Sequence, residues 1–126
     1  MTDRTGLVLV LPWPDMSLMP NRKNGRHWGS VQGAKAKARR DGHVVAWSEL
    51  GRAKFHHSGR VPVRITFMSP DNRARDIDNL LACIKPQLDG IAKAIDVDDK
   101  YFRPMVLDEG VDPERRGYLK IELGDI

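Results

Sequence analysis

Residues 76–99 constrain this chain more than any other stretch, because they combine a helical apolar pattern with a dense cluster of carboxylates. The stretch reads DIDNLLACIKPQLDGIAKAIDVDD and carries six aspartates against two lysines, a net charge of −4. The whole chain of 126 residues is +4, so the remaining residues sum to +8. Clustered carboxylates repel one another, and a bound divalent cation with oxygen ligands is the usual compensation. The stretch therefore predicts a helix beside a metal site.

The apolar residues of this stretch recur with helical spacing at Leu81, Ile84, Leu88, Ile91 and Ile95. Steps of three and four residues predict one buried helix face. Asp78 comes just before the pattern and is predicted to cap the helix N-terminus. Pro86 removes one helix hydrogen bond and crowds the preceding turn, so we expect a kink at residues 82–85.

Several polar side chains are predicted to share one side of this helix. Lys85 and Asp89 return to the direction of Asp78 on a helical wheel, beside the apolar face. Asp76 lies two residues before Asp78, so on an extended segment both carboxylates leave on the same side. This stripe would form the wall of a cleft.

Each part of the acidic stretch also has a simpler interpretation. Asp78 alone is typical of a helix cap, and Lys85 with Asp89 is typical of an exposed i,i+4 pair. Asp98 and Asp99, which follow the helix, would alone be a solvated turn. Their concentration in one short span favours a metal centre with hard oxygen ligands.

The N-terminal half is as basic as the later stretch is acidic. Residues 1–60 contain eleven Lys and Arg against four acids, a net charge of +7, and all four histidines. A basic half beside an acidic pocket suggests a polyanion held next to a metal, although a merely soluble basic surface is the alternative. His27 could equally be a surface histidine without a role. The candidate DNA-binding residues are Asn21, Arg22, Lys23, Arg26, His27, Arg73 and Arg75.

The remaining apolar patterns predict the fold. Strands are expected at 7–11 and 61–68, with a last strand pair at 101–109 and 117–123. A helix is expected from Ser30, as its cap, to about Phe55, with Trp47 on its inner side. The elements predict an α+β single domain over residues 1–126, in which a small mixed sheet of about four strands is covered by two helices.

Composition narrows the cellular setting. There is no apolar run near 18 residues and no signal-peptide pattern at the N-terminus, so we expect a cytoplasmic protein without a membrane partner. The single cysteine, Cys83, suggests a reducing compartment and a packing role. No glycine-rich phosphate loop indicates a nucleotide cofactor.

Four motifs resemble the RusA family of Holliday-junction resolvases, particularly its phage and prophage members. These are Leu11-Pro12-Trp13-Pro14 with Asn21 and Trp28, Asp76-Ile77-Asp78-Asn79-Leu80, Lys85-Pro86-x-Leu88-Asp89-Gly90, and Asp98-Asp99. The resemblance spans most of the chain. It implies a homodimeric endonuclease, dependent on Mg²⁺ with Mn²⁺ as a substitute, that cuts branched DNA at symmetric positions.

Site residues carry over from the family motifs one at a time. Asp76, Asp78 and Asp99 match the metal-binding aspartates, and Asp89 or Asp98 is a further candidate ligand. Lys85 matches the lysine that assists catalysis. In some members that lysine lies in the first helical turn after the DxDN motif, where this chain has Ala82, so Lys85 assumes the phage-type arrangement.

The expected function is therefore metal-dependent hydrolysis of phosphodiesters in four-way or branched DNA, during recombination and repair, in a bacterial or phage-infected cytoplasm. One alternative is a protein of the same fold that binds branched DNA without cutting it. Another is an unrelated protein with a structural Ca²⁺ site, which leaves the basic N-terminal half unexplained.

Overall fold

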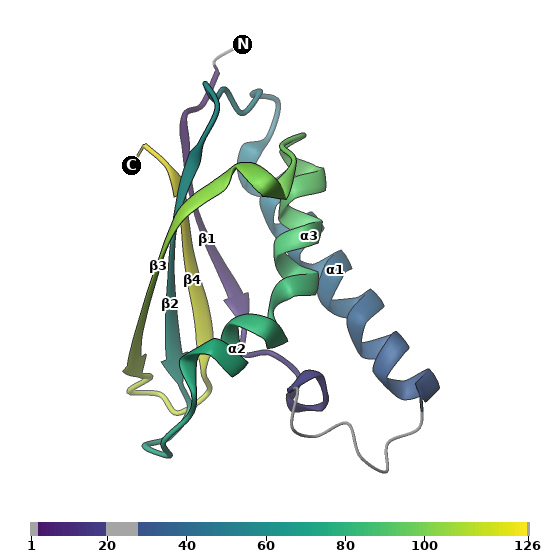
Figure 1. The fold of residues 1–126 in the computed structure, drawn as a ribbon, viewed down its shortest axis with the longest axis vertical. Coiled ribbons are helices and arrows are strands. Elements are labelled where there is room, and N and C mark those ends of the chain that lie inside the picture. Colours follow the sequence, from purple (N-terminus) through teal and green to yellow (C-terminus); the bar gives the residue numbers. More distant parts are fainter. Residues whose placement is uncertain (1–2, 20–27, 126) are drawn as a thin grey trace.

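The computed structural model describes residues 3–19 and 28–125, with the backbone alone at 28–30. One sheet forms the first layer, and the helices pack against one of its faces (Figure 1). None of the described helices is long and apolar enough to cross a bilayer. The elements are β1 Gly6–Pro12, η1 Met16–Leu18, α1 Trp28–Leu50, β2 Val61–Ser69, α2 Ile77–Cys83, α3 Lys85–Ala94, η3 Asp99–Tyr101, β3 Phe102–Val111 and β4 Tyr118–Gly124.

The sheet has four strands in the order β1-β4-β2-β3. β4 is antiparallel to both β1 and β2, whereas β3 is parallel to β2. The predicted α+β fold with a small mixed sheet is thus confirmed. The expected pairing of the last two strands is wrong, because β2 lies between them. A parallel neighbour needs a long crossover, and α2 and α3 supply it between β2 and β3.

Alternating side chains of the strands build the core under the helices. Buried and exposed residues alternate along β2 and β4, as the sequence predicted. They also alternate along β1, where the continuous apolar run predicted a fully buried strand but Val8 and Val10 are exposed. Leu9, Ile65 and Ile121 are at most 1% exposed and mark the centre of this inner face. Their burial against the helices fixes which face of the sheet is covered, since a strand has a side-chain period of two.

α1 differs from its prediction at both ends. It begins at Trp28, so Ser30 lies inside the helix instead of capping it. It ends at Leu50 rather than near Phe55. The next residue, Gly51, adopts a positive φ of 64°, a conformation that glycine takes readily at a helix C-terminus. Trp47 is 63% exposed, and the prediction that it faces inward is wrong.

The predicted kink near Pro86 is a complete break. α2 ends at Cys83 and α3 begins at Lys85, with Pro86 in the first turn of α3, where its missing N–H costs no helix hydrogen bond. The break shifts the helical phase, so Leu80 and Cys83 are buried while Leu81 is only partly buried.

Two glycines allow α1 and α3 to approach closely. A Cβ added to Gly42 would clash with the Gln87 backbone, and one added to Gly90 would clash with the Arg39 carbonyl. The inner side of α1 is therefore built from small residues, with Ala38 and Ala46 buried on either side of Gly42. This close approach explains why a glycine interrupts the middle of a long helix.

We predict that Gly42→Ala lowers the free energy of unfolding by about 1–3 kcal/mol, because the added methyl group overpacks the interface. Gly33→Ala in the same helix is the matched control, since nothing lies within 4 Å of its Cβ position. It should stabilise the chain by about 1 kcal/mol through helix propensity. Urea unfolding followed by circular dichroism measures both, and equal effects would contradict the close packing.

Candidate functional site

The start of α2 presents the first two candidate aspartates. Asp76 is the N-cap residue, in extended conformation, and its side chain makes no capping hydrogen bond. It accepts instead a hydrogen bond from Asn79 Nδ2 at 3.4 Å. Asp78 lies within the first turn of α2, so its predicted place as the cap, reached along an extended segment, is wrong. Both carboxylates are exposed.

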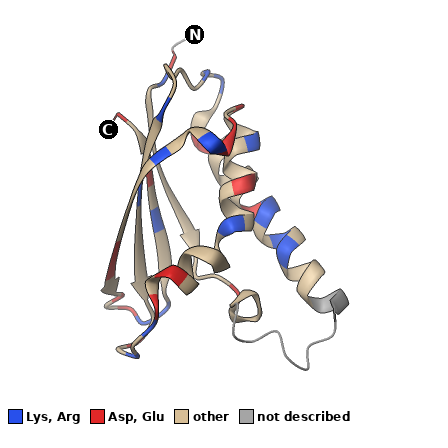
Figure 2. Cartoon of the chain, in the orientation of Figure 1, with Lys and Arg blue, Asp and Glu red and all other residues tan. Residues whose placement is uncertain are grey.

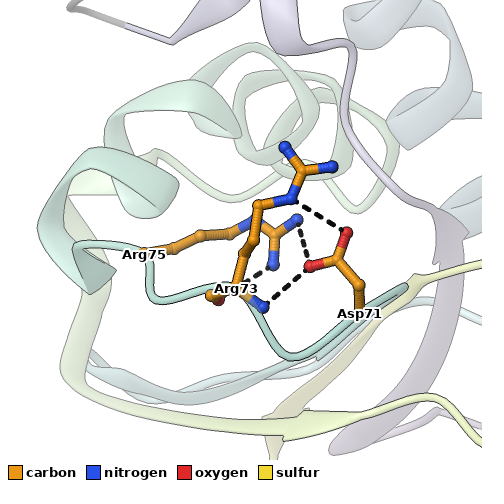
Figure 3. Close-up of polar contacts among 3 residues, drawn as sticks. All are labelled: Asp71, Arg73 and Arg75. Carbon is orange, nitrogen blue, oxygen red and sulfur yellow. Dashed lines mark hydrogen bonds and ion pairs between the residues drawn. The ribbon is translucent and has the colours of Figure 1, made fainter.

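The loop that leads to Asp76 is held by Asp71 (Figure 3). The backbone N–H of Arg73 donates to Asp71 Oδ1 at 2.9 Å, and Arg75 Nη2 lies 3.0 Å from the same oxygen. The hydrogen bond from Arg73 and the nearby Arg75 guanidinium lower the pKa of Asp71. The sequence Ser69-Pro70-Asp71-Asn72 predicts a turn, but sequence analysis assigned Asp71 no role at the site.

The two candidate DNA-binding arginines of this loop differ in availability. The Arg75 side chain is only 13% exposed and its guanidinium lies 5.5 Å from the centre of the Trp13 ring. The Arg73 side chain is 78% exposed. Arg75 therefore shapes the loop, while Arg73 is accessible to a ligand.

A cavity of about 580 Å³ lies between this loop and the segment after β1. Its apolar side includes Trp13, Met16 and Met19, and its polar side includes Asp76 and Asn79. We call it the Trp13 pocket. Among the predicted metal ligands, Asp76 is the one that lines it.

The other candidate carboxylates line a separate cavity of about 470 Å³ beside α3 and η3. This acidic pocket is lined by Asp89, Asp96, Asp98 and Asp99, together with the cations Arg39 of α1 and Lys93 of α3. Burial, a hydrogen bond with Asp99 and the Asp99 charge raise the pKa of Asp89, against the opposing charges of Arg39 and Lys85. Asp98 caps η3 by accepting a hydrogen bond from the Lys100 N–H at 3.0 Å.

Lys85 lines a third cavity, of about 240 Å³, which adjoins the acidic pocket. Arg39 and Asp89 line both cavities, so the two are neighbours along α1 and α3. The remaining polar residues of this third cavity are Lys35 and Ser17, and we call it the basic pocket. Figure 2 shows the positive segments of α1 and α3 beside the negative segments of α3 and η3.

Cys83 also lines the basic pocket but is built into the core. It is fully buried, and burial, with a smaller effect of Asp15, raises the pKa of its thiol to about 11. Its Sγ donates a hydrogen bond to the Asp15 carbonyl at 3.5 Å. The packing role that sequence analysis assigned to Cys83 is confirmed.

The predicted metal-binding aspartates thus do not gather at one cavity. Asp76 lines the Trp13 pocket, Asp89, Asp98 and Asp99 line the acidic pocket, and Asp78 lines neither of them. Among the side chains that the structure describes, no group of three or more His, Cys, Asp or Glu residues is placed to hold a metal ion. The candidate loop residues Asn21, Arg22, Lys23, Arg26 and His27 lie outside the described residues.

The contact between Asp89 and Asp99 predicts a pH-dependent stability. The pKa of Asp89 is higher in the folded chain than its ordinary value of 3.8, so protonation of Asp89 stabilises the folded state below pH 3.8. This stabilisation is lost as the pH rises through the raised pKa. Asp89→Asn should therefore raise the midpoint of thermal unfolding at pH 7 by a few degrees at most, since the pair is largely solvent-exposed.

Thermal scans in EDTA and low salt, at pH 7 and pH 3, measure this effect. The gain should disappear at pH 3, where both proteins carry neutral side chains at this position. Asp125→Asn, at an exposed position after β4, is the control and should change little. A loss of stability at pH 7 in Asp89→Asn would contradict repulsion between Asp89 and Asp99.

The chain was compared with protein-family profiles and with curated proteins. No protein-family profile matches the chain. An uncharacterized protein of Xylella fastidiosa (strain Temecula1 / ATCC 700964) is 38% identical over 107 residues, covering 80% of this chain and 67% of that protein.

Proposed function

The chain belongs to the same family as this Xylella fastidiosa protein, and we propose that it is a metal-dependent endodeoxyribonuclease that cuts four-way or branched DNA. The proposed reaction is hydrolysis of phosphodiesters by paired symmetric cuts, as the resemblance to RusA resolvases implies. The proposed setting is recombination and repair in a bacterial or phage-infected cytoplasm. Mg²⁺ is the proposed cofactor, with Mn²⁺ as a substitute.

One observation supports this proposal most directly. The basic pocket and the acidic pocket adjoin, and they share Arg39 and Asp89. A DNA backbone needs cationic contacts, whereas carboxylates repel it unless a cation intervenes. Carboxylates next to cationic side chains therefore favour an enzyme that binds a metal ion and a phosphate together over a protein that only binds DNA.

The proposed roles follow the family motifs. Asp76, Asp78 and Asp99 are the proposed metal-binding residues, with Asp89 or Asp98 as a further one. Because the described side chains do not gather three such groups around one ion, the metal requirement rests on the resemblance and needs its own test. Lys85 is proposed to offset negative charge on the phosphate.

A second candidate function is branched-DNA binding without cleavage. The observation that favours it is the separation of Asp76 from Asp99 into different pockets. A chain that had lost its metal ligands would still bind DNA through its basic surface but would not hydrolyse phosphodiesters. The two functions differ in one measurable respect, which is cutting in the presence of Mg²⁺.

The first test is therefore cleavage of a labelled four-way junction, with and without Mg²⁺ and with Mn²⁺, resolved on a denaturing gel. The proposal expects paired cuts that need the divalent ion and stop in EDTA. A junction that is bound but never cut would establish the second candidate. Neither binding nor cutting would reject both.

We predict that Asp76→Asn, Asp78→Asn or Asp99→Asn abolishes cleavage and leaves junction binding equal or tighter, because each change removes a negative charge near phosphate. Asp96→Asn, in the acidic pocket but outside the proposed ligand set, is the matched control and should lose much less activity. Near wild-type cutting by any of the three variants would remove that residue from the ligand set.

We also predict a homodimer, since paired cuts on a two-fold symmetric junction need one site per subunit. Light scattering after gel filtration at micromolar concentration should give about twice the 14.2 kDa chain mass. A monomer that still cut a junction at paired positions would reject the dimer.

A further inference from the structure

The basic pocket gathers cationic groups from separate elements around a small cavity. Lys35 and Arg39 come from α1, and Lys85 comes from the start of α3. Among the described residues that line the cavity, Asp89 is the carboxylate, so three positive charges face one negative charge. Leu18, Val31 and Pro86 supply apolar walls. At about 240 Å³ the cavity is smaller than a typical drug-sized site and suits one compact polar group.

The three cations have no ion pair or hydrogen bond among the described residues. Other cations of this chain do have such partners. Lys37, on the same helix, lies 2.9 Å from Asp41, and Arg73 and Arg75 both pair with Asp71. Asp89 supplies a single negative charge against these three positive charges, although it interacts electrostatically with Arg39 and Lys85. The basic pocket therefore keeps an excess of positive charge for a ligand.

Ser17 adds an independent sign that the cavity takes a polar ligand. Its Oγ is buried and has no hydrogen-bond partner, although a buried hydroxyl without a partner is costly. η1 holds this residue in place, since Asp15 Oδ1 accepts a hydrogen bond from the Ser17 N–H at 2.9 Å. A hydroxyl can donate to an anionic oxygen, so a phosphate oxygen that reached this buried atom would satisfy it.

We propose that the basic pocket binds a single phosphate group of a nucleic-acid strand, through Lys35, Arg39, Lys85 and the Ser17 hydroxyl. This inference rests on the proposed function, because it assigns one phosphate of the substrate strand to a defined place. Without a bound divalent cation, the adjoining carboxylates of the acidic pocket repel a second phosphate, so the strand is held with one phosphate on the basic side. The ligand is a phosphate oxyanion, either inside a strand or at its end.

The test is an NMR titration of the ¹⁵N-labelled full chain in EDTA, which excludes cleavage and metal binding. The probes are TpT, which has one internal phosphodiester, thymidine 5′-monophosphate, which has a terminal phosphate, and thymidine, which has none. We expect saturable shifts at the amides of Ser17, Lys35 and Lys85 with a phosphate-bearing probe and none with thymidine. TpT binding identifies an internal phosphate as the ligand, and binding of the monophosphate alone identifies a strand end.

Matched double variants decide whether the pocket is the site. Lys35→Gln with Arg39→Gln removes two charges from the pocket, and Lys37→Gln with Arg40→Gln removes two charges from the same helix outside it. The first should weaken probe binding by about tenfold or more, and the second by less than about twofold. Ser17→Ala should weaken it by about threefold to tenfold. Equal losses in the two double variants, or shifts with thymidine as large as with the phosphate probes, would overturn the proposal.

Junction cleavage in Mg²⁺ separates this inference from the proposed function. A chain that binds the probes in the pocket but never cuts a junction would keep the phosphate site and reject the nuclease. A chain that cuts junctions, and whose Lys35→Gln/Arg39→Gln variant binds and cuts like the wild type, would keep the nuclease and reject the site. Dispersed amide spectra of every variant exclude unfolding as the cause of a loss.

Discussion

The backbones of α1 and α3 meet directly at Gly42 and Gly90, and the functional side of the molecule depends on that contact. No larger side chain fits at either position without moving a helix. Because the backbones of the two helices are in contact, no layer of apolar side chains separates them at this point. Charged side chains of α1 therefore lie close to those of α3. Arg39 illustrates this, since its carbonyl packs on Gly90 while its side chain lines both the basic and the acidic pocket.

A second constraint is the break between α2 and α3. A continuous helix from Asp78 to Ile95 would have placed Asp78, Lys85 and Asp89 along one wall. The break at Ile84 instead places Lys85 in the first turn of a new helix, facing α1 and η1, where it joins Lys35 around a shared cavity. The carboxylates are divided in the same way, with Asp76 at the Trp13 pocket and Asp99 beside Asp89.

The two acidic regions are therefore organised by different forces. At the entrance to α2, Asp71 orders its loop through a backbone N–H and two guanidinium groups, and this loop delivers Asp76 to the Trp13 pocket. In the acidic pocket no described cation forms an ion pair with Asp89, and burial with the nearby Asp99 raises its pKa against the smaller opposing effects of Arg39 and Lys85. Carboxylates and cationic side chains therefore lie next to one another along α1 and α3.

The sequence by itself determined the strands, the α+β class and the disruption at Pro86, because side-chain periodicity and the missing proline N–H act over a few neighbouring residues. It did not determine that β2 separates β3 from β4, or that Trp47 faces solvent, since both depend on partners distant in the chain. The acidic and basic composition predicted charged pockets. Their membership was decided by tertiary structure, because the contact at Gly42 and Gly90 sets which side chains of α1 and α3 can reach the same cavity.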